Sequence, residues 1–244
     1  QLPRHPAGRQ GPEGRKAQGQ GRTAQGEEGG RITIAANDAH FTSANIQVNG
    51  GNGRGATITL AAANDQYFNQ VTLQANGTTD GGAITITTAS GDIYFTNALI
   101  QTNGSTGRGG SIGLSATNLT QIANSSITAN GYTQGGIIKI GNDASDGSLP
   151  FSIYTDIDSS SVISTDALLN NQNQINTDYV GGFIETSGHT LNLLASINAG
   201  RGGMWLIDPY DFTIGATEAA LIITALNTQA VTISTATSAT SPVT

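Results

Sequence analysis

Residues 29–34 read GGRITI, and variants of this phrase follow as GATITL at 55–60, GGAITI at 81–86, GGSIGL at 109–114 and GGIIKI at 135–140. Three further columns keep a common step of 27 residues. The first holds an Asn-Gly pair and the other two hold apolar residues: Asn49, Asn76, Asn103 and Asn130; Phe41, Phe68, Phe95 and Ile122; Ile46, Leu73, Ile100 and Ile127. Only the short connection after each Asn-Gly pair varies in length, by one residue. Fixed columns with variable outer turns indicate a solenoid.

The phrases themselves have the pattern of β-strands. Runs such as Ile32-Thr33-Ile34 alternate apolar and polar residues, the period of a strand with one buried face. Such short strands cannot bury that face alone, but coils stacked about 4.8 Å apart make a continuous core. The sequence therefore predicts an all-β, right-handed parallel β-helix with coils of about 27 residues. A propeller blade needs roughly 40 residues and is the weaker alternative.

This fold assigns a direction to each column. We expect the Phe and Ile/Leu columns to point inward and the threonines of the phrases, Thr33, Thr59 and Thr85, to point outward. The Asn-Gly pairs are expected at bends, where Asn followed by Gly tolerates a positive φ.

Composition narrows the class of protein. The 244 residues include 33 glycines, with 11% charged and 5% aromatic residues, which suits closely spaced turns and does not suit a compact α/β enzyme. The net charge is −7, and the basic residues beyond Ile32 are few: Arg54, Arg108, Lys139 and Arg201. Nucleic acid is not expected as a partner, because phosphate binding needs clustered Lys and Arg. The absence of cysteine suits an exported repeat protein that crosses a membrane unfolded.

The two ends of the chain differ from the repeats. Residues 1–28 hold one large apolar residue, Leu2, so we expect a disordered or artefactual leader; a basic tail that touches an acidic surface is the alternative. This segment has no apolar run of a signal peptide, and no stretch of the chain is long and apolar enough to span a membrane. The β-helix is predicted over 29–234 and a Ser/Thr-rich exit segment over 235–244.

The period is lost over 141–180, where we predict one longer coil with an irregular insertion. The segment contains Pro150, a polar run over 170–176 and four acidic residues: Asp143, Asp146, Asp156 and Asp158. Asp clusters can bind calcium, but neither the EF-hand loop nor the Gly-rich calcium nonapeptide is present. We expect an ordinary solvated loop without metal.

From Gly181 the pattern returns as GGFIETSGHTLNLLASINAGRGGMWLIDPYDFTIG over 181–215. This stretch resembles a segment of large exoproteins of the filamentous haemagglutinin and high-molecular-weight adhesin type, which are exported by two-partner secretion. There a GGF-x-E-T-S-G phrase precedes W-L-hydrophobic-D-P and a T-I strand. The matching residues here are Gly181, Gly182, Phe183, Glu185, Thr186, Ser187, Gly188, Trp205, Leu206, Asp208, Pro209, Thr213 and Ile214. The upstream repeats resemble the same family by period and composition.

The resemblance implies a structural or adhesive shaft segment of a secreted exoprotein on the surface of a Gram-negative-type bacterium, without catalysis. Its implied partners are an outer-membrane two-partner transporter, acting through a secretion domain absent from this sequence, and a host, neighbour-cell or matrix surface. The family has no catalytic positions to carry over. We therefore predict no catalytic, cofactor-binding or metal-binding residues, no cofactor, and no insertion into a membrane.

Two alternatives stay open. Parallel β-helices also host polysaccharide lyases and hydrolases, which need converging acids; the residues to consider are Glu185, Asp208 and Asp211. Of the histidines His5, His40 and His189, the last stands near Glu185 and Ser187 as a possible nucleophile site. A flat threonine array can bind ice or crystals, but Gly113 and Lys139 interrupt the threonine column.

The C-terminal part closes the repeat. Trp205 is expected to complete the core of the last regular coil, and Asp208-Pro209 to stop its strand. Residues 217–227 form the one plausible helix, capped by Thr217, with an apolar face that covers the open end of the stack: Leu221, Ile222, Ala225 and Leu226. A further strand is predicted over 231–234.

Overall fold

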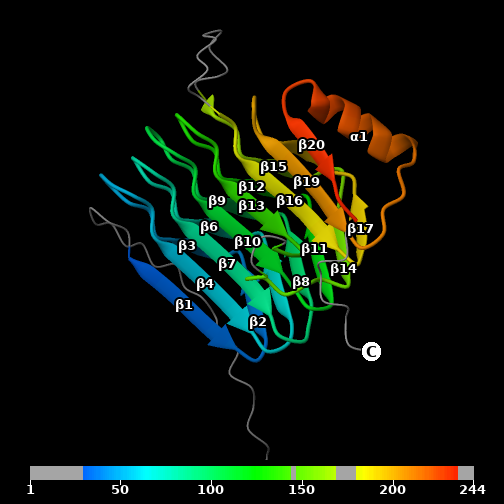
Figure 1. Cartoon of the computed structure of the whole chain (residues 1–244). Helices are drawn as coiled ribbons and strands as arrows, with labels where there is room; N and C mark the ends of the chain where they lie inside the picture. The colour runs from blue at the N-terminus through cyan, green and yellow to red at the C-terminus, as the bar shows by residue number, and fades with distance from the viewer. Residues whose placement is uncertain (1–29, 144–146, 169–179, 236–244) are drawn as a thin grey trace, which may run out of the picture.

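The chain folds into a solenoid of short parallel strands. The computed structural model describes residues 30–143, 147–168 and 180–235; the predicted leader over 1–28 and the exit segment beyond Thr235 lie outside these ranges. Three parallel sheets run along the stack, one of eight strands and two of six (Figure 1). Each of the six coils gives one strand to each sheet, so the predicted parallel β-helix is confirmed.

The strands recur in the same order in every coil. The eight-stranded sheet, which faces the viewer in Figure 1, consists of β1 (Arg31–Ala36), β4 (Thr57–Ala62), β7 (Ala83–Thr88), β10 (Ser111–Ser115), β13 (Ile137–Ile140), β16 (Phe183–Gly188), β19 (Met204–Pro209) and β20 (Ala230–Ile233). The second sheet consists of β2 (Ala39–Thr42), β5 (Gln66–Asn69), β8 (Ile93–Thr96), β11 (Leu119–Ala123), β14 (Tyr154–Ile157) and β17 (Thr190–Leu193). The third consists of β3 (Asn45–Gln47), β6 (Thr72–Gln74), β9 (Leu99–Gln101), β12 (Ser126–Thr128), β15 (Val162–Ser164) and β18 (Ser196–Asn198).

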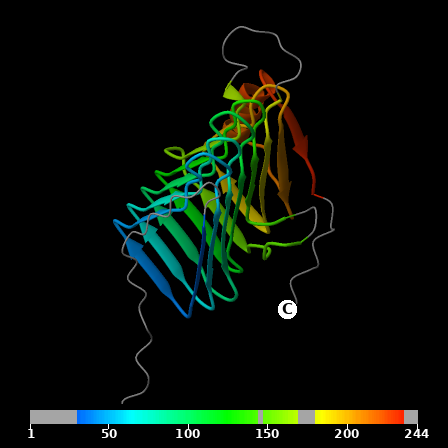
Figure 2. The same ribbon diagram turned by 90° about the vertical axis from the view of Figure 1, so that its left-hand side faces the viewer.

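The core is built from ladders of like side chains. Phe41, Phe68 and Phe95 are register partners, and their rings stack with centroids 5.0 and 4.8 Å apart. All three are at most 1% exposed, whereas Thr59 lies partly exposed on the outer face. The inward and outward assignments are thus confirmed. Figure 2 shows the coils stacked one behind another around this narrow core.

The Asn-Gly corners work differently from the prediction. The side-chain oxygen of each Asn accepts the backbone N–H of the next one along the stack, as from Asn76 to Asn49 at 2.9 Å. The glycines do not have positive φ; that conformation occurs one bend earlier, at Ser43, Gln70, Asn97 and Asn124. The prediction of positive φ at the Asn-Gly pairs is therefore wrong. Glycine is required there by close packing, since a Cβ on Gly77 would lie 1.8 Å from the carbonyl oxygen of Asp80.

The range 141–180 contains two regular strands, β14 and β15, with longer connections around them. Ile157 pairs with Ile122 although 35 residues separate them, so the stack continues through the irregular coil. The Asp166 N–H donates to the side chain of Asn130 at 2.7 Å, and Ala167 pairs with Gly131. Asp-Ala thereby takes the place of Asn-Gly. The polar run over 170–176 lies outside the described residues.

The last regular coil closes as the sequence predicts. Trp205 is 1% exposed, and its indole N–H donates to the Thr186 hydroxyl at 3.0 Å. Strand β19 ends at Pro209, which has no N–H with which to continue the ladder.

Helix α1 (Ala216–Leu226) follows and contacts β18 and β20 at the C-terminal end of the stack (Figure 1). Its N-cap is Gly215, whose N–H donates to the Glu218 carboxylate at 2.9 Å, so the expected cap at Thr217 is wrong by two residues. Ala225 is buried, but Leu226 is 55% exposed because it lies one helical step away from the face that meets the stack. The described residues contain no helix long and apolar enough to cross a membrane.

Candidate functional sites

Glu185 and Ser187 lie on the outer face of β16 but are covered. Each is at most 1% exposed, and the Ser187 hydroxyl donates to Glu185 at 3.0 Å. The ring of His189 instead stacks on Tyr210, with centroids 4.8 Å apart. Ser187 therefore faces a carboxylate rather than an imidazole, and both residues are buried. His5 lies outside the described residues.

The other two acids of the enzyme hypothesis, Asp208 and Asp211, lie in different surroundings. Asp208 lies within β19, next to the residue that ends the strand, and is the register partner of Ser187. Burial raises the pKa of Asp208, against the lowering effect of a hydrogen bond with Ser234. Asp211 is exposed beyond the end of the strand. Of the three acids, Glu185 and Asp208 lie on adjacent strands. Asp208 is opposite Ser187, which is two residues along β16 from Glu185.

The segment after β13 folds back over the outer face of the eight-stranded sheet. We call its described part, residues 141–143 and 147–152, the strap. Leu149 is 7% exposed and lies 3.1 Å from the position that a Cβ on Gly113 would occupy. The Ser115 hydroxyl donates to the Pro150 carbonyl at 2.5 Å and fixes the far end of the strap. Gly113 thus interrupts the threonine column because the strap needs the space.

Ion pairing holds the near end of the strap. The Lys139 ammonium donates to Asp143, and the Ser148 hydroxyl donates to the second oxygen of the same carboxylate at 2.6 Å. Asp143 is 5% exposed, so the prediction of a solvated acidic loop is wrong for this residue; pairing with Lys139 offsets the cost of its burial. Among the described residues no group of His, Cys, Asp or Glu side chains is arranged to hold a metal ion.

A small pocket opens beside the strap. Its volume is about 290 Å³ and it crosses β7, β10 and β13. It is lined by Thr85, Ser111, Ile112, Gly113, Ile137, Lys139, Asp143, Ser148 and Leu149. We call it the strap pocket. It combines hydroxyl groups, one ion pair and apolar side chains, and it lies where the outer surface departs from the repeat.

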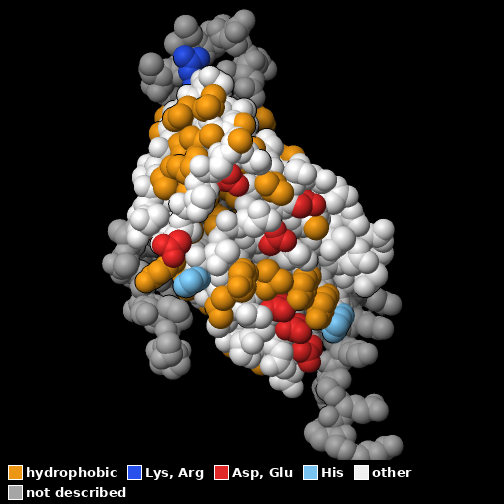
Figure 3. All heavy atoms as spheres, turned by 90° about the vertical axis from the view of Figure 1, so that its right-hand side faces the viewer, with side chains coloured by type: hydrophobic (Ala, Val, Ile, Leu, Met, Phe, Trp, Pro, Cys, Tyr) orange, Lys and Arg blue, Asp and Glu red, His pale blue; other side chains and the backbone are white. Residues whose placement is uncertain are grey.

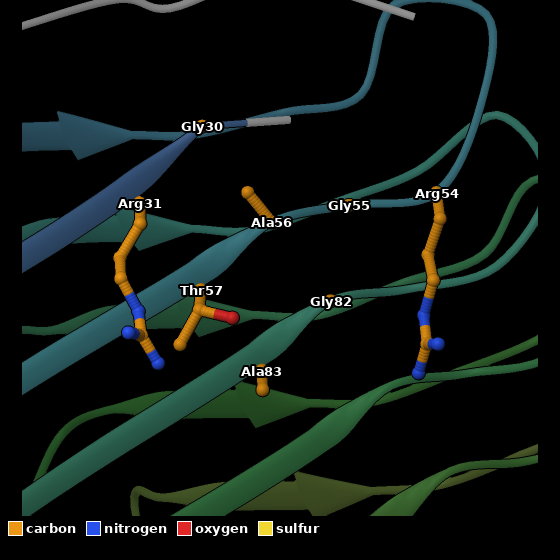
Figure 4. A pocket seen from close by; sticks show the side chains of 8 residues that line it. All are labelled: Gly30, Arg31, Arg54, Gly55, Ala56, Thr57, Gly82 and Ala83. Atoms are coloured by element: carbon orange, nitrogen blue, oxygen red, sulfur yellow. The ribbon is translucent and has the colours of Figure 1, made fainter. Parts of the chain in front are cut away.

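A larger groove of about 480 Å³ lies at the N-terminal coils, with Arg31 and Arg54 at its two ends (Figure 4). Between them the lining is small: Gly30, Gly55, Ala56, Thr57, Gly82 and Ala83. Within the described residues neither guanidinium forms an ion pair. Both side chains are exposed, however, and solvent screening makes such charges weak.

An aromatic and acidic strip runs along the second sheet. The rings of His40, Tyr67 and Tyr94 stack with centroids 4.7 and 5.0 Å apart. Tyr94 donates to Asp92 at 2.7 Å; this hydrogen bond, with burial, raises the pKa of Tyr94 to about 12. Figure 3 shows acidic and hydrophobic side chains side by side on this face of the molecule. Because stacked rings cover one another's faces, the strip offers ring edges and hydroxyls, not an open aromatic platform.

The fold defines the class of the molecule as a parallel β-helix with a strapped outer face. No protein-family model, no curated protein and no solved structure matches the chain.

Proposed function

We propose that this chain is a shaft segment of a secreted, adhesin-like exoprotein on the surface of a Gram-negative-type bacterium. The observation that carries the proposal is the unbroken register of six coils in three parallel sheets. Adjacent coils are hydrogen-bonded through their strands in the three sheets, so the stack is stiff and its length grows by about 4.8 Å per coil. A stiff polar rod is suited to present a binding surface at a distance from the cell.

The partners follow from the resemblance of 181–215 to haemagglutinin-type exoproteins. An outer-membrane two-partner transporter would act on a secretion domain outside this sequence, and a host, neighbour-cell or matrix surface would be the target. The absence of cysteine supports export in an unfolded form, because no disulfide can obstruct passage.

A carbohydrate-active β-helix enzyme is the second candidate, and the proximity of Glu185 to Asp208 favours it. An acid pair of this kind has to reach the glycosidic bond from both sides. Here Glu185 is 1% exposed and accepts a hydrogen bond from Ser187, which supports a structural role.

The test uses the whole chain coupled to beads. Beads that carry the folded protein should be retained on bacterial or animal cell layers, or on polysaccharide matrix, in a saturable way. Beads with Phe68→Asp, which disrupts the core, should not be retained, while beads with the outer-face variant Thr59→Asp should be. No reducing or unsaturated sugar ends should appear in pectin or alginate. Release of such ends that is lost in Glu185→Gln/Asp208→Asn would overturn the shaft proposal in favour of a carbohydrate-active enzyme.

A further inference from the structure

We infer that the strap pocket binds one neutral sugar residue of a surface glycan; this inference rests on the proposed adhesive function. The first argument is position. In a repeat protein, insertions map to one face, which is often the binding face, and local departures from the pattern mark functional sites. Gly113 and Lys139 break the threonine column at the point where the strap crosses it.

The second argument is chemistry. Thr85 and Ser111 are lining residues with a hydroxyl group, which both donates and accepts hydrogen bonds. The Ser148 hydroxyl, which donates to Asp143, can still accept one. A sugar presents the same dual groups around its ring. Ile137, which is 45% exposed, and Leu149 supply an apolar wall for the C–H face of such a ring. Ile137 thereby gains a role that its exposure alone does not explain.

Charge selects a neutral ligand over an anion. The outer face here holds one ammonium, Lys139, beside two buried carboxyl groups, Asp143 and Glu185, and Glu185 is the register partner of Lys139. An incoming carboxylate or sulfate would be placed next to Asp143, the acid that lines the pocket. A ligand cation would be placed against Lys139.

The volume of the strap pocket selects a ligand of one sugar ring. Pockets for drug-sized ligands measure about 300 to 1,000 Å³, and the strap pocket, at about 290 Å³, lies just below that range. Asp143 is buried and fixed by its bonds to Lys139 and Ser148, so this part of the lining is formed before any ligand arrives. The pocket therefore fits one sugar residue at the end or in a branch of a glycan.

The test is titration of the whole protein with D-galactose, D-glucose, D-mannose and N-acetyl-D-glucosamine, followed by saturation-transfer NMR and calorimetry. At least one sugar should bind with a dissociation constant in roughly the millimolar range, as expected for a ligand of few contacts. Acetate and ethylammonium, the charged probes, should not bind.

Two variants locate the site. Thr85→Val removes one lining hydroxyl at nearly constant volume and should weaken sugar binding about fivefold to tenfold. Thr59→Val makes the same change in the same column one coil earlier, outside the pocket, and should leave binding unchanged. Leu149→Ala, which removes the Leu149 part of the apolar wall, should weaken binding by at least about tenfold without unfolding the stack.

Failure of all four sugars to bind, preferential binding of a charged probe, or equal effects of Thr85→Val and Thr59→Val would each overturn the inference. Beads that still adhere in those cases would leave the shaft proposal standing. Sugar binding without any bead adhesion would have the opposite meaning: it would support the pocket and contradict the shaft proposal.

Discussion

At the scale of single residues, the place of a side chain in the repeat decides what it contacts. Phe68 lies between Phe41 and Phe95 in one ladder, and all three rings are buried. Aromatic pairs of this kind contribute about 0.5–1.5 kcal/mol beyond their buried area. A change at such a position therefore acts on three coils at once.

The first prediction compares the two faces. Phe68→Asp places a carboxylate in the ladder without a partner and should lower the free energy of unfolding by at least about 3 kcal/mol. Thr59→Asp, on the outer face, should lower it by less than about 1 kcal/mol. Urea unfolding followed by circular dichroism measures both. Equal shifts of the two midpoints would contradict the assignment of inner and outer faces.

The second prediction concerns pH. Since the pKa of Tyr94 is raised from 10.0 to about 12, the folded state holds this proton more tightly than the unfolded chain does. The contribution to stability is full below pH 10 and is lost as pH rises from about 10 to 12. Tyrosinate absorbance, taken as the difference between the wild type and Tyr94→Phe, should titrate near 12, and Asp92→Asn should lower that midpoint. A wild-type midpoint near 10 would contradict the raised pKa of Tyr94.

The ladders could be predicted from the sequence because each stacked column repeats large apolar residues, as Phe41, Phe68 and Phe95 do. The positive φ at the bend before each Asn-Gly corner could not be predicted, because that column holds Ser43, Gln70, Asn97 and Asn124. No glycine marks it, and side chains that differ this much give no common signal. The glycines of the Asn-Gly pairs are instead required by the approach of a carbonyl oxygen, which depends on the neighbouring turn and cannot be read locally.

At the scale of elements, the strap shows what periodic reasoning misses. An insertion has no counterpart in the other coils, so its position cannot follow from the period. A signal was nevertheless present, since Gly113 and Lys139 interrupt the threonine column and both contact the strap in the structure. Interruption of an outer column is therefore informative about an inserted segment nearby.

The third prediction concerns the helix cap. Ala225 and Leu226 are neighbours in α1, with 5% and 55% of their surface exposed. Ala225→Glu forces a charge between the helix and the end of the stack, and should cost at least about 2 kcal/mol. Leu226→Glu should change the free energy of unfolding by less than about 0.5 kcal/mol, or improve solubility. The thermal unfolding midpoints of the two variants test this prediction. A larger loss of stability for Leu226→Glu would mean that α1 meets the stack by its other face.

At the scale of the whole molecule, coils of one length are interchangeable units. Each coil contacts only its neighbours, so stability is approximately a sum over coils and their interfaces. Removing one complete coil should bring matching columns together, whereas removing part of one should not. A fold organised around a single central site would tolerate neither change.

The most direct measurement is excision of residues 82–109, the span from one Gly-Gly phrase to the next. It places Ile58 beside Ile112 and Phe68 beside Ile122, so the ladders re-form. The shortened protein should keep its circular dichroism spectrum and cooperative unfolding, and small-angle scattering should show a rod shorter by about 4.8 Å. Excision of residues 82–95 alone, about half a coil, should abolish folding. A full-coil excision that unfolds, or a half-coil excision that is equally stable, would contradict the account of this protein as a rod of stacked, interchangeable coils.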